Sequence, residues 1–246
     1  MNYLKYVLIV LVLMSCSDED FSTLTNDTNI LSTYIEGKAI EIGAVIACSA
    51  NNNGNAEIVE TYFYPEGNAT NFKLFETSSG DVDPNLFSNY NLVTISDSPF
   101  FNGYLRKFTR SSTTEQWLIV TYELDGEIKL SNPIRTKNII QPTLFSDQII
   151  INQDQPLMPI FNWEVNSEAD NAIFFEVLST VDDYLLSGTY TFETQFQYYN
   201  TSNVVLNITE GTPPDLMLGQ DYKFTIMDVS EDNWVNEVFI SQFTLQ

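Results

Sequence analysis

Past residue 33 the chain is a succession of short apolar or alternating runs separated by turn residues, and no long stretch has helical periodicity. Runs of this length and spacing favour an all-β fold of the sandwich type. The strands expected in the first half are residues 39–47, 59–64, 72–76, 104–109, 117–124 and 127–130. Asp125-Gly126, between the last two, predicts a tight hairpin turn. Pro133 then closes the set at a sheet edge, so one domain is expected over residues 34–138.

A second set of runs follows the first at similar spacing. The strands expected here are residues 148–151, 160–165, 172–178, 189–192, 204–208, 222–229 and 235–244. More than 200 residues after the N-terminal segment are enough for two modest domains. The pattern therefore predicts a second sandwich over residues 139–246.

The N-terminus has a different pattern, in which Lys5 precedes an apolar stretch at residues 6–14 and Ser15 precedes Cys16. This order is typical of a secretory signal that ends in a lipidation site. The apolar stretch is about half the ~20 residues that a membrane-spanning helix needs. We expect residues 1–15 to be a signal peptide and Cys16 to be acylated, which anchors the protein to a membrane. The alternative is a cleaved, soluble secreted protein.

Residues 16–33 are rich in Asp, Ser, Thr and Asn, a composition typical of a flexible tether. Directly after Cys16, the run Ser17, Asp18, Glu19 and Asp20 resembles the start of mature lipoproteins of the Bacteroidota. In that group a similar acidic run directs lipoproteins to the cell surface. The resemblance implies a lipid-anchored outer-membrane protein facing the cell exterior, with the periplasmic face as the alternative.

Two features of the second half resemble fibronectin type III domains. Trp163 matches the core tryptophan of that family, and Leu218-Gly219-Gln220-Asp221-Tyr222 resembles its tyrosine corner, in which the hydroxyl bonds to upstream backbone. In the first half, Trp117 stands in the place of the corner tyrosine and Cys48 in that of the core tryptophan. The resemblance implies tandem fibronectin type III-like sandwiches, which serve mostly as spacers and binding platforms.

Acidic residues dominate the charge of the chain. Without residues 1–15 there remain 33 acidic and 9 basic residues, a net charge of −24. So negative a protein repels the phosphate backbone, which argues against nucleic-acid binding. Residues 34–138 have a net charge of −5, whereas residues 139–246 hold only Lys223 against 16 acids. Arg106, Lys107 and Arg110 are candidates for docking an acidic partner surface. The alternative is that they are solvated strand positions that discourage edge pairing.

Catalytic chemistry is restricted because the chain has no histidine. This absence excludes Ser-His-Asp and Cys-His nucleophiles and histidine-ligated metals. Cys48 lies in an apolar run and is expected to be a small buried hydrophobe. The acidic stretches at residues 81–83 and 228–233 are candidate calcium sites because they place several oxygen ligands close together. Neither has the complete spacing of a calcium loop. The sequence thus predicts no enzyme, no cofactor and no metal site.

Aromatic residues in turn-rich places are the remaining candidates, either as exposed binding contacts or as core lids. They are Phe100, Phe101, Tyr198, Tyr199 and, beside the final hairpin, Trp234. Together these observations predict a non-catalytic, lipid-anchored outer-membrane protein that is a subunit of a larger envelope complex for transport, protein export or barrel assembly. The alternative is a surface glycan-binding lipoprotein.

Overall fold

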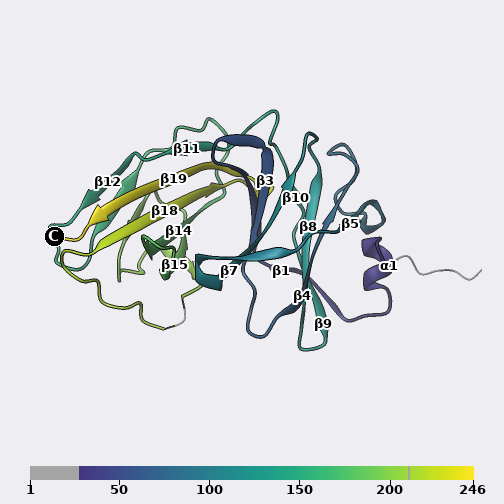
Figure 1. Cartoon of the computed structure of the whole chain (residues 1–246), viewed down its shortest axis with the longest axis horizontal. Coiled ribbons are helices and arrows are strands. Elements are labelled where there is room, and N and C mark those ends of the chain that lie inside the picture. Colours follow the sequence, from purple (N-terminus) through teal and green to yellow (C-terminus); the bar gives the residue numbers. More distant parts are fainter. Residues whose placement is uncertain (1–27, 210) are drawn as a thin grey trace, which may run out of the picture.

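The computed structural model describes residues 28–209 and 211–246. The expected signal peptide, the lipidation site Cys16 and the acidic run from Ser17 to Asp20 lie outside the described residues. The described part contains 19 strands, one short helix, α1 (Leu31–Ile35), and the 3₁₀ turns η1 (Phe87–Asn89) and η2 (Phe101–Gly103). The chain forms two β-sandwiches that lie side by side (Figure 1). The all-β class expected from the sequence is confirmed.

The first sandwich packs two sheets against each other. One sheet has the order β1 (Ile40–Val45), β9 (Glu127–Ser131), β8 (Trp117–Leu124), β4 (Thr70–Glu76) and β5 (Asn91–Val93), with β10 (Ile134–Arg135) paired to β8. The other has the order β2 (Ala47–Asn52), β3 (Asn55–Phe63), β7 (Leu105–Ser111) and β6 (Asp97–Phe100). Between them, Phe63 stacks on Phe108 at 5.4 Å and both pack with Leu74 and Val120.

The second sandwich has a six-stranded and a three-stranded sheet. The larger has the order β11 (Leu144–Ser146), β19 (Val235–Thr244), β18 (Asp221–Val229), β14 (Ile173–Thr180), β15 (Leu185–Thr191) and β17 (Val204–Asn207). The smaller has the order β12 (Ile149–Asn152), β13 (Ile160–Trp163) and β16 (Gln195–Gln197). In the core between them Phe161 stacks on Phe224 at 3.8 Å, and Trp163 meets Phe174 edge-on at 5.3 Å.

The tyrosine corner of the second sandwich forms as the sequence predicts. Tyr222 is buried near the start of β18, and its Oη accepts a hydrogen bond of 2.8 Å from the backbone N–H of Met217, five residues upstream. Trp163 is likewise buried in the core. The expectations for both residues are confirmed.

The equivalences proposed for the first sandwich are only partly met. The Trp117 indole donates to the carbonyl of Gly80, 37 residues away, so it does not form a corner of the Tyr222 kind. In the second sandwich the core tryptophan, Trp163, lies on β13, the second strand of its sheet along the chain. Cys48 lies on β2, the first strand of the corresponding sheet, so the prediction that Cys48 takes the place of the core tryptophan is wrong. The residue equivalent to Trp163 is Phe63, at the end of β3. Phe63 pairs with Ala47 on the preceding strand, just as Trp163 pairs with Ile149, and it supplies the aromatic ring of the first core.

Two further boundaries differ from the sequence-based expectation. The single strand expected over residues 39–47 is divided into β1, which runs parallel to β9, and β2, which joins the other sheet. Gly43, with φ of +78°, lies at the irregularity in β1 that precedes this change of sheet. Leu31 and Tyr34 of α1 are buried against Phe75. Residues 31–33, expected in the tether, therefore belong to the packed first sandwich.

Replacing Tyr222 with phenylalanine should lower the free energy of unfolding by about 0.5–1.5 kcal/mol, because the part-buried hydrogen bond from the Met217 N–H to the Tyr222 hydroxyl is lost. Urea unfolding measures the change. Tyr184→Phe is the matched control, because Tyr184 lies half exposed in the same sandwich. Equal urea midpoints for the two variants would contradict a stabilising corner bond.

Candidate functional site at the junction of the two sandwiches

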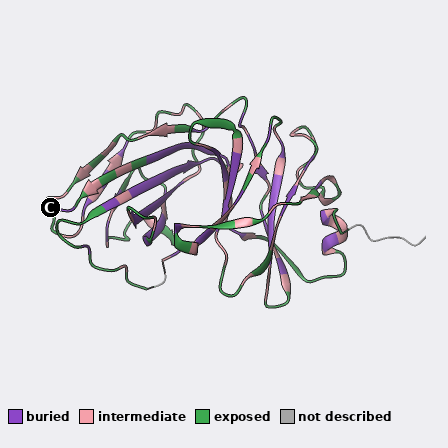
Figure 2. Ribbon diagram, viewed as in Figure 1, coloured by how far each residue is buried: buried purple, intermediate pink, exposed green. Residues whose placement is uncertain are grey.

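The two sandwiches share one hydrophobic core where they meet. Strand β14 is buried on both faces because Phe174 points into its own sandwich while Phe175 and Val177 point toward the first one. Buried segments accordingly occupy strands of both sandwiches at their junction (Figure 2). The first sandwich contributes Ala50, Tyr62, Phe101 and Leu105 to this core. Burial of this shared apolar surface holds the two sandwiches together as one body.

The turn at residues 230–234, between β18 and β19, is docked onto the first sandwich. Its Asn233 carbonyl accepts from Ser49 N–H at 3.0 Å and its Asp232 carbonyl accepts from Arg135 N–H at 2.9 Å. The Asp232 carboxylate also forms an ion pair of 2.7 Å with Lys137. The final hairpin thus forms part of the intramolecular junction.

Trp234 lies in this junction with 0% of its surface exposed. Its indole N–H donates to the Gln141 carbonyl at 2.9 Å, so the polar edge of the ring is satisfied inside the protein. The expectation that Trp234 offers an exposed binding surface is corrected, because the hairpin that carries it is covered by the first sandwich and by the segment around Gln141.

The basic candidates are engaged in ion pairs within the first sandwich. Lys107 pairs with Glu60 at 2.7 Å, and Arg106 pairs with Asp97 on the neighbouring strand β6. In the described residues, seven of the nine Lys and Arg side chains form such pairs. A docking role for Arg106, Lys107 and Arg110 stays a prediction, but little of their charge is free to attract a partner.

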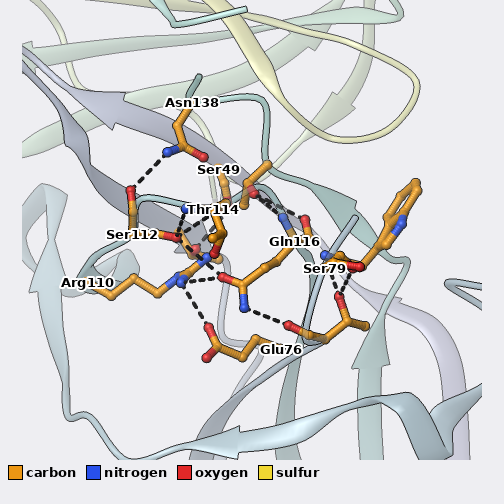
Figure 3. A network of polar contacts seen from close by, with 12 residues as sticks. Ser49, Glu76, Ser79, Arg110, Ser112, Thr114, Gln116 and Asn138 are labelled. Carbon is orange, nitrogen blue, oxygen red and sulfur yellow. Dashed lines mark hydrogen bonds and ion pairs between the residues drawn. The ribbon is translucent and has the colours of Figure 1, made fainter. Parts of the chain in front are cut away.

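Arg110 belongs to a largely buried polar network, with 8% of its side chain exposed (Figure 3). It forms an ion pair of 2.9 Å with Glu76 and donates to Gln116 Oε1, also at 2.9 Å. Gln116 in turn donates to the Thr77 carbonyl, and Asn138 donates to the Ser112 carbonyl at 3.0 Å. The network ties β4, β7 and β8 to the segment that leaves the first sandwich, which is a structural role.

The acidic stretches already have partners inside the protein. Asp228 is buried and accepts from Asn171 Nδ2 at 2.5 Å, and burial raises the pKa of its carboxyl. Asp83 Oδ1 accepts from the Asn85 N–H at 2.9 Å. Within residues 28–209 and 211–246, no group of three or more acidic or cysteine side chains is placed to hold a metal ion.

The other aromatic candidates fold back onto the protein. Phe101 and Tyr198 are buried, and Phe100 and Tyr199 are partly buried. Tyr198 Oη donates to the Pro214 carbonyl at 2.6 Å. The most exposed aromatic side chain among the described residues is that of Phe192, which no sequence pattern singled out. None of the aromatic candidates named above forms an open platform on which a sugar ring could stack, which disfavours the glycan-binding alternative.

A cavity of about 250 Å³ lies at the junction, beside the shared core. Both sandwiches line it, and its wall is mainly apolar, with contributions from Val45, Ala47, Cys48, Tyr62, Leu105, Asn132, Ile173, Phe175, Tyr190, Leu206, Met227, Val229 and Asn233. No lysine, arginine, aspartate or glutamate is part of this wall. Cavities of this kind at domain interfaces are common ligand sites.

Cys48 and Tyr190 form the reactive part of the cavity wall. Both keep some accessible surface although they lie deep in the protein, because that surface faces the cavity. Burial raises the pKa of the Cys48 thiol to about 12 and that of the Tyr190 hydroxyl well above its usual value. Both groups are therefore neutral at physiological pH, and the Cys48 thiol has little nucleophilic character.

Sequence reasoning did not identify this cavity. Its wall combines Cys48 with Tyr190 and Leu206, which lie far apart along the chain and are brought together only by docking of the sandwiches. One sequence pattern does point to the junction. The run at residues 172–178 is apolar almost throughout, which is typical of a strand buried on both faces.

No family model matches the sequence, and no curated protein does. Among solved structures, the chain is similar to a fibronectin(III)-like module of Clostridium thermocellum CbhA, with 9% identity and a TM-score of 0.24 over 85% of this chain and 90% of that one. At this score the likeness adds no weight to the fold assignment, which rests on the strand order and the tyrosine corner.

Proposed function

We propose that this protein is a non-catalytic lipoprotein of the outer membrane, held by an acylated Cys16 and facing the cell exterior. The observation that carries the proposal is the succession of Lys5, the apolar stretch at residues 6–14 and Ser15-Cys16, followed at once by the acidic run from Ser17 to Asp20. Among residues 28–209 and 211–246, none of the helices has the length and apolar character of a membrane span.

In this proposal the two sandwiches act as an accessory or binding subunit of a larger envelope complex, of the transport, protein-export or barrel-assembly type. Their shared core and the docked hairpin support this role, because a body with few internal degrees of freedom loses little entropy when it joins an assembly. The acid-rich second sandwich favours a partner with a basic surface.

The variant Cys16→Ala should be lost from the membrane fraction, because acylation is the proposed anchor. Fractionation of cells followed by a high-salt wash measures this. A processed variant that stays in the washed membrane pellet would overturn the lipid anchor. Replacement of Ser17 to Asp20 by neutral residues should keep the anchor but protect the protein from protease added to intact cells, and unchanged digestion would remove the export signal.

The subunit role is tested by affinity purification from native membranes in mild detergent. We expect an envelope protein to be recovered in a fixed ratio to this chain and to be lost when the acidic surface of the second sandwich is neutralised. Recovery of this chain alone would contradict the subunit role while leaving the anchor in place.

A further inference from the structure

We propose that the cavity between the two sandwiches binds one neutral, mainly apolar small molecule, either a fused aromatic ring system or a short acyl chain. This function is separate from the anchoring and assembly proposed above. It rests on the cavity of about 250 Å³ and on the chemistry of the side chains that line it.

The size of the cavity sets the size of the ligand. An apolar protein cavity of about 150 Å³ holds benzene, so by proportion this cavity accommodates about ten non-hydrogen atoms. Protein interiors are otherwise packed with few voids larger than a water molecule. An apolar space of this volume within the joint between two sandwiches is thus a structural feature with room for a guest.

The wall selects for a neutral ligand. It contains no acidic or basic side chain, and the Cys48 and Tyr190 groups that reach it are kept uncharged by burial. A charged molecule would lose its hydration without gaining a counter-charge, which is unfavourable. Apolar contacts come from both sides, for example from Leu105 of the first sandwich and Phe175 of the second.

Polar atoms in the wall allow for one hydrogen-bonding group on the ligand. Tyr62 donates its hydroxyl proton to Glu60 at 2.5 Å, which leaves its oxygen lone pairs as acceptors. The Asn132 side chain also lines the cavity, near Gly43. A hydroxyl or carbonyl on an otherwise apolar molecule is therefore compatible with this site.

Strand β17 carries two adjacent positions, Leu206 and Val205, that form a matched pair for a test. Leu206 lines the cavity and is 43% exposed, so it stands at the rim. Val205 is 52% exposed and is not part of the wall, because successive side chains of a strand point to opposite faces. Both positions have open surface into which a tryptophan side chain extends without disrupting the core.

The test uses the expected mature chain, residues 16–246, with Cys16→Ala, which carries neither the acyl group nor the apolar stretch at residues 6–14 and so needs no detergent that would compete for the cavity. The probes are 1-naphthol, which is neutral and close to the expected size, and 1-naphthalenesulfonate, which is charged. Titration calorimetry should show one site for 1-naphthol, with the sulfonate bound at least about tenfold more weakly. Leu206→Trp should weaken 1-naphthol binding by about tenfold or more, whereas Val205→Trp should leave it unchanged.

A second readout places the probe in the cavity. In the Cys16→Ala chain Cys48 is the sole thiol. Its raised pKa makes its reaction with the uncharged reagent methyl methanethiolsulfonate slow, and bound 1-naphthol should slow that reaction further. Displacement of 1-naphthol by 1-octanol would assign the site to acyl chains, and its failure to compete would assign it to aromatic rings. Equal affinity for the two naphthalene probes, equal effects of the two tryptophan variants, or unprotected Cys48 would each overturn the proposal. None of these results bears on the lipid anchor.

Discussion

Replacing Trp234 with alanine should lower the free energy of unfolding by about 3–5 kcal/mol, the usual cost of removing a large buried aromatic side chain. Trp234 is fully buried, and its indole N–H donates to the Gln141 carbonyl. The truncation therefore removes apolar contacts, leaves a cavity and deprives a backbone carbonyl of its donor. Urea unfolding followed by circular dichroism measures the loss.

Phe192→Ala is the matched control for this prediction, because Phe192 is an aromatic residue of the same sandwich with 65% of its surface exposed. Its truncation should change the stability by less than about 0.5 kcal/mol. If Trp234→Ala were no more destabilising than Phe192→Ala, the docked position of the final hairpin would be refuted.

The position of Trp234 also implies that the two sandwiches unfold together. The turn at residues 230–234 binds Ser49 and Arg135 of the first sandwich, so its loss should weaken the junction as well as the second core. We expect one cooperative transition in the parent protein and a broader or split transition in Trp234→Ala. A transition that is equally cooperative in both proteins would place the coupling in the apolar junction core alone.

Local sequence determined the elements whose signals are short-range. The mainly apolar run at residues 117–124 forms β8 with the expected bounds, and the Asp125-Gly126 turn joins it to β9. Both turn residues have positive φ, of 52° and 84°, which this dipeptide tolerates well. The tyrosine corner was also predictable, because its hydrogen bond spans only five residues.

Features that depend on distant partners were not predictable from one sequence. Trp234 follows a turn, and the sequence left open whether it is an exposed contact or a core lid. The structure decides this through a distant contact, because Asn233 beside it donates to the Pro133 carbonyl, 100 residues earlier in the chain. In the same way, Arg110 reads as a solvated basic residue until Glu76 and Gln116 are placed beside it. The cavity depends on the same docking of two sandwiches, so no local pattern could identify it.

Glu176 gives the second large effect, a dependence of stability on pH. It lies on β14 with 1% of its surface exposed, where its Oε2 accepts from Thr189 and its Oε1 has no hydrogen-bond partner. Burial raises the pKa of its carboxyl to about 9. Such a group is protonated in the folded protein at neutral pH, because an ionised carboxylate would be unpaired in the core.

The sign of the effect follows from the raised pKa. The unfolded chain releases this proton near pH 4.5, whereas the folded protein holds it until about pH 9. Its contribution to stability is therefore fully present below pH 4.5 and is lost as the pH rises toward 9, by up to about 1.4 kcal/mol per pH unit. Asp228, whose pKa is also raised by burial, acts in the same direction.

Glu176→Gln should remove this dependence, because the amide is neutral in both states and keeps an oxygen that can accept from Thr189. We compare the free energy of unfolding of the variant with that of the parent protein at each pH. Between pH 4.5 and pH 7 this difference should shift in favour of the variant by up to about 3 kcal/mol. Urea unfolding at several pH values measures the gain, and the subtraction cancels the contribution of Asp228. Glu193→Gln, at an exposed position, should leave the pH profile unchanged. Parallel profiles for Glu176→Gln and the parent protein would show that Glu176 ionises in the folded state, and would contradict its burial as an unpaired acid.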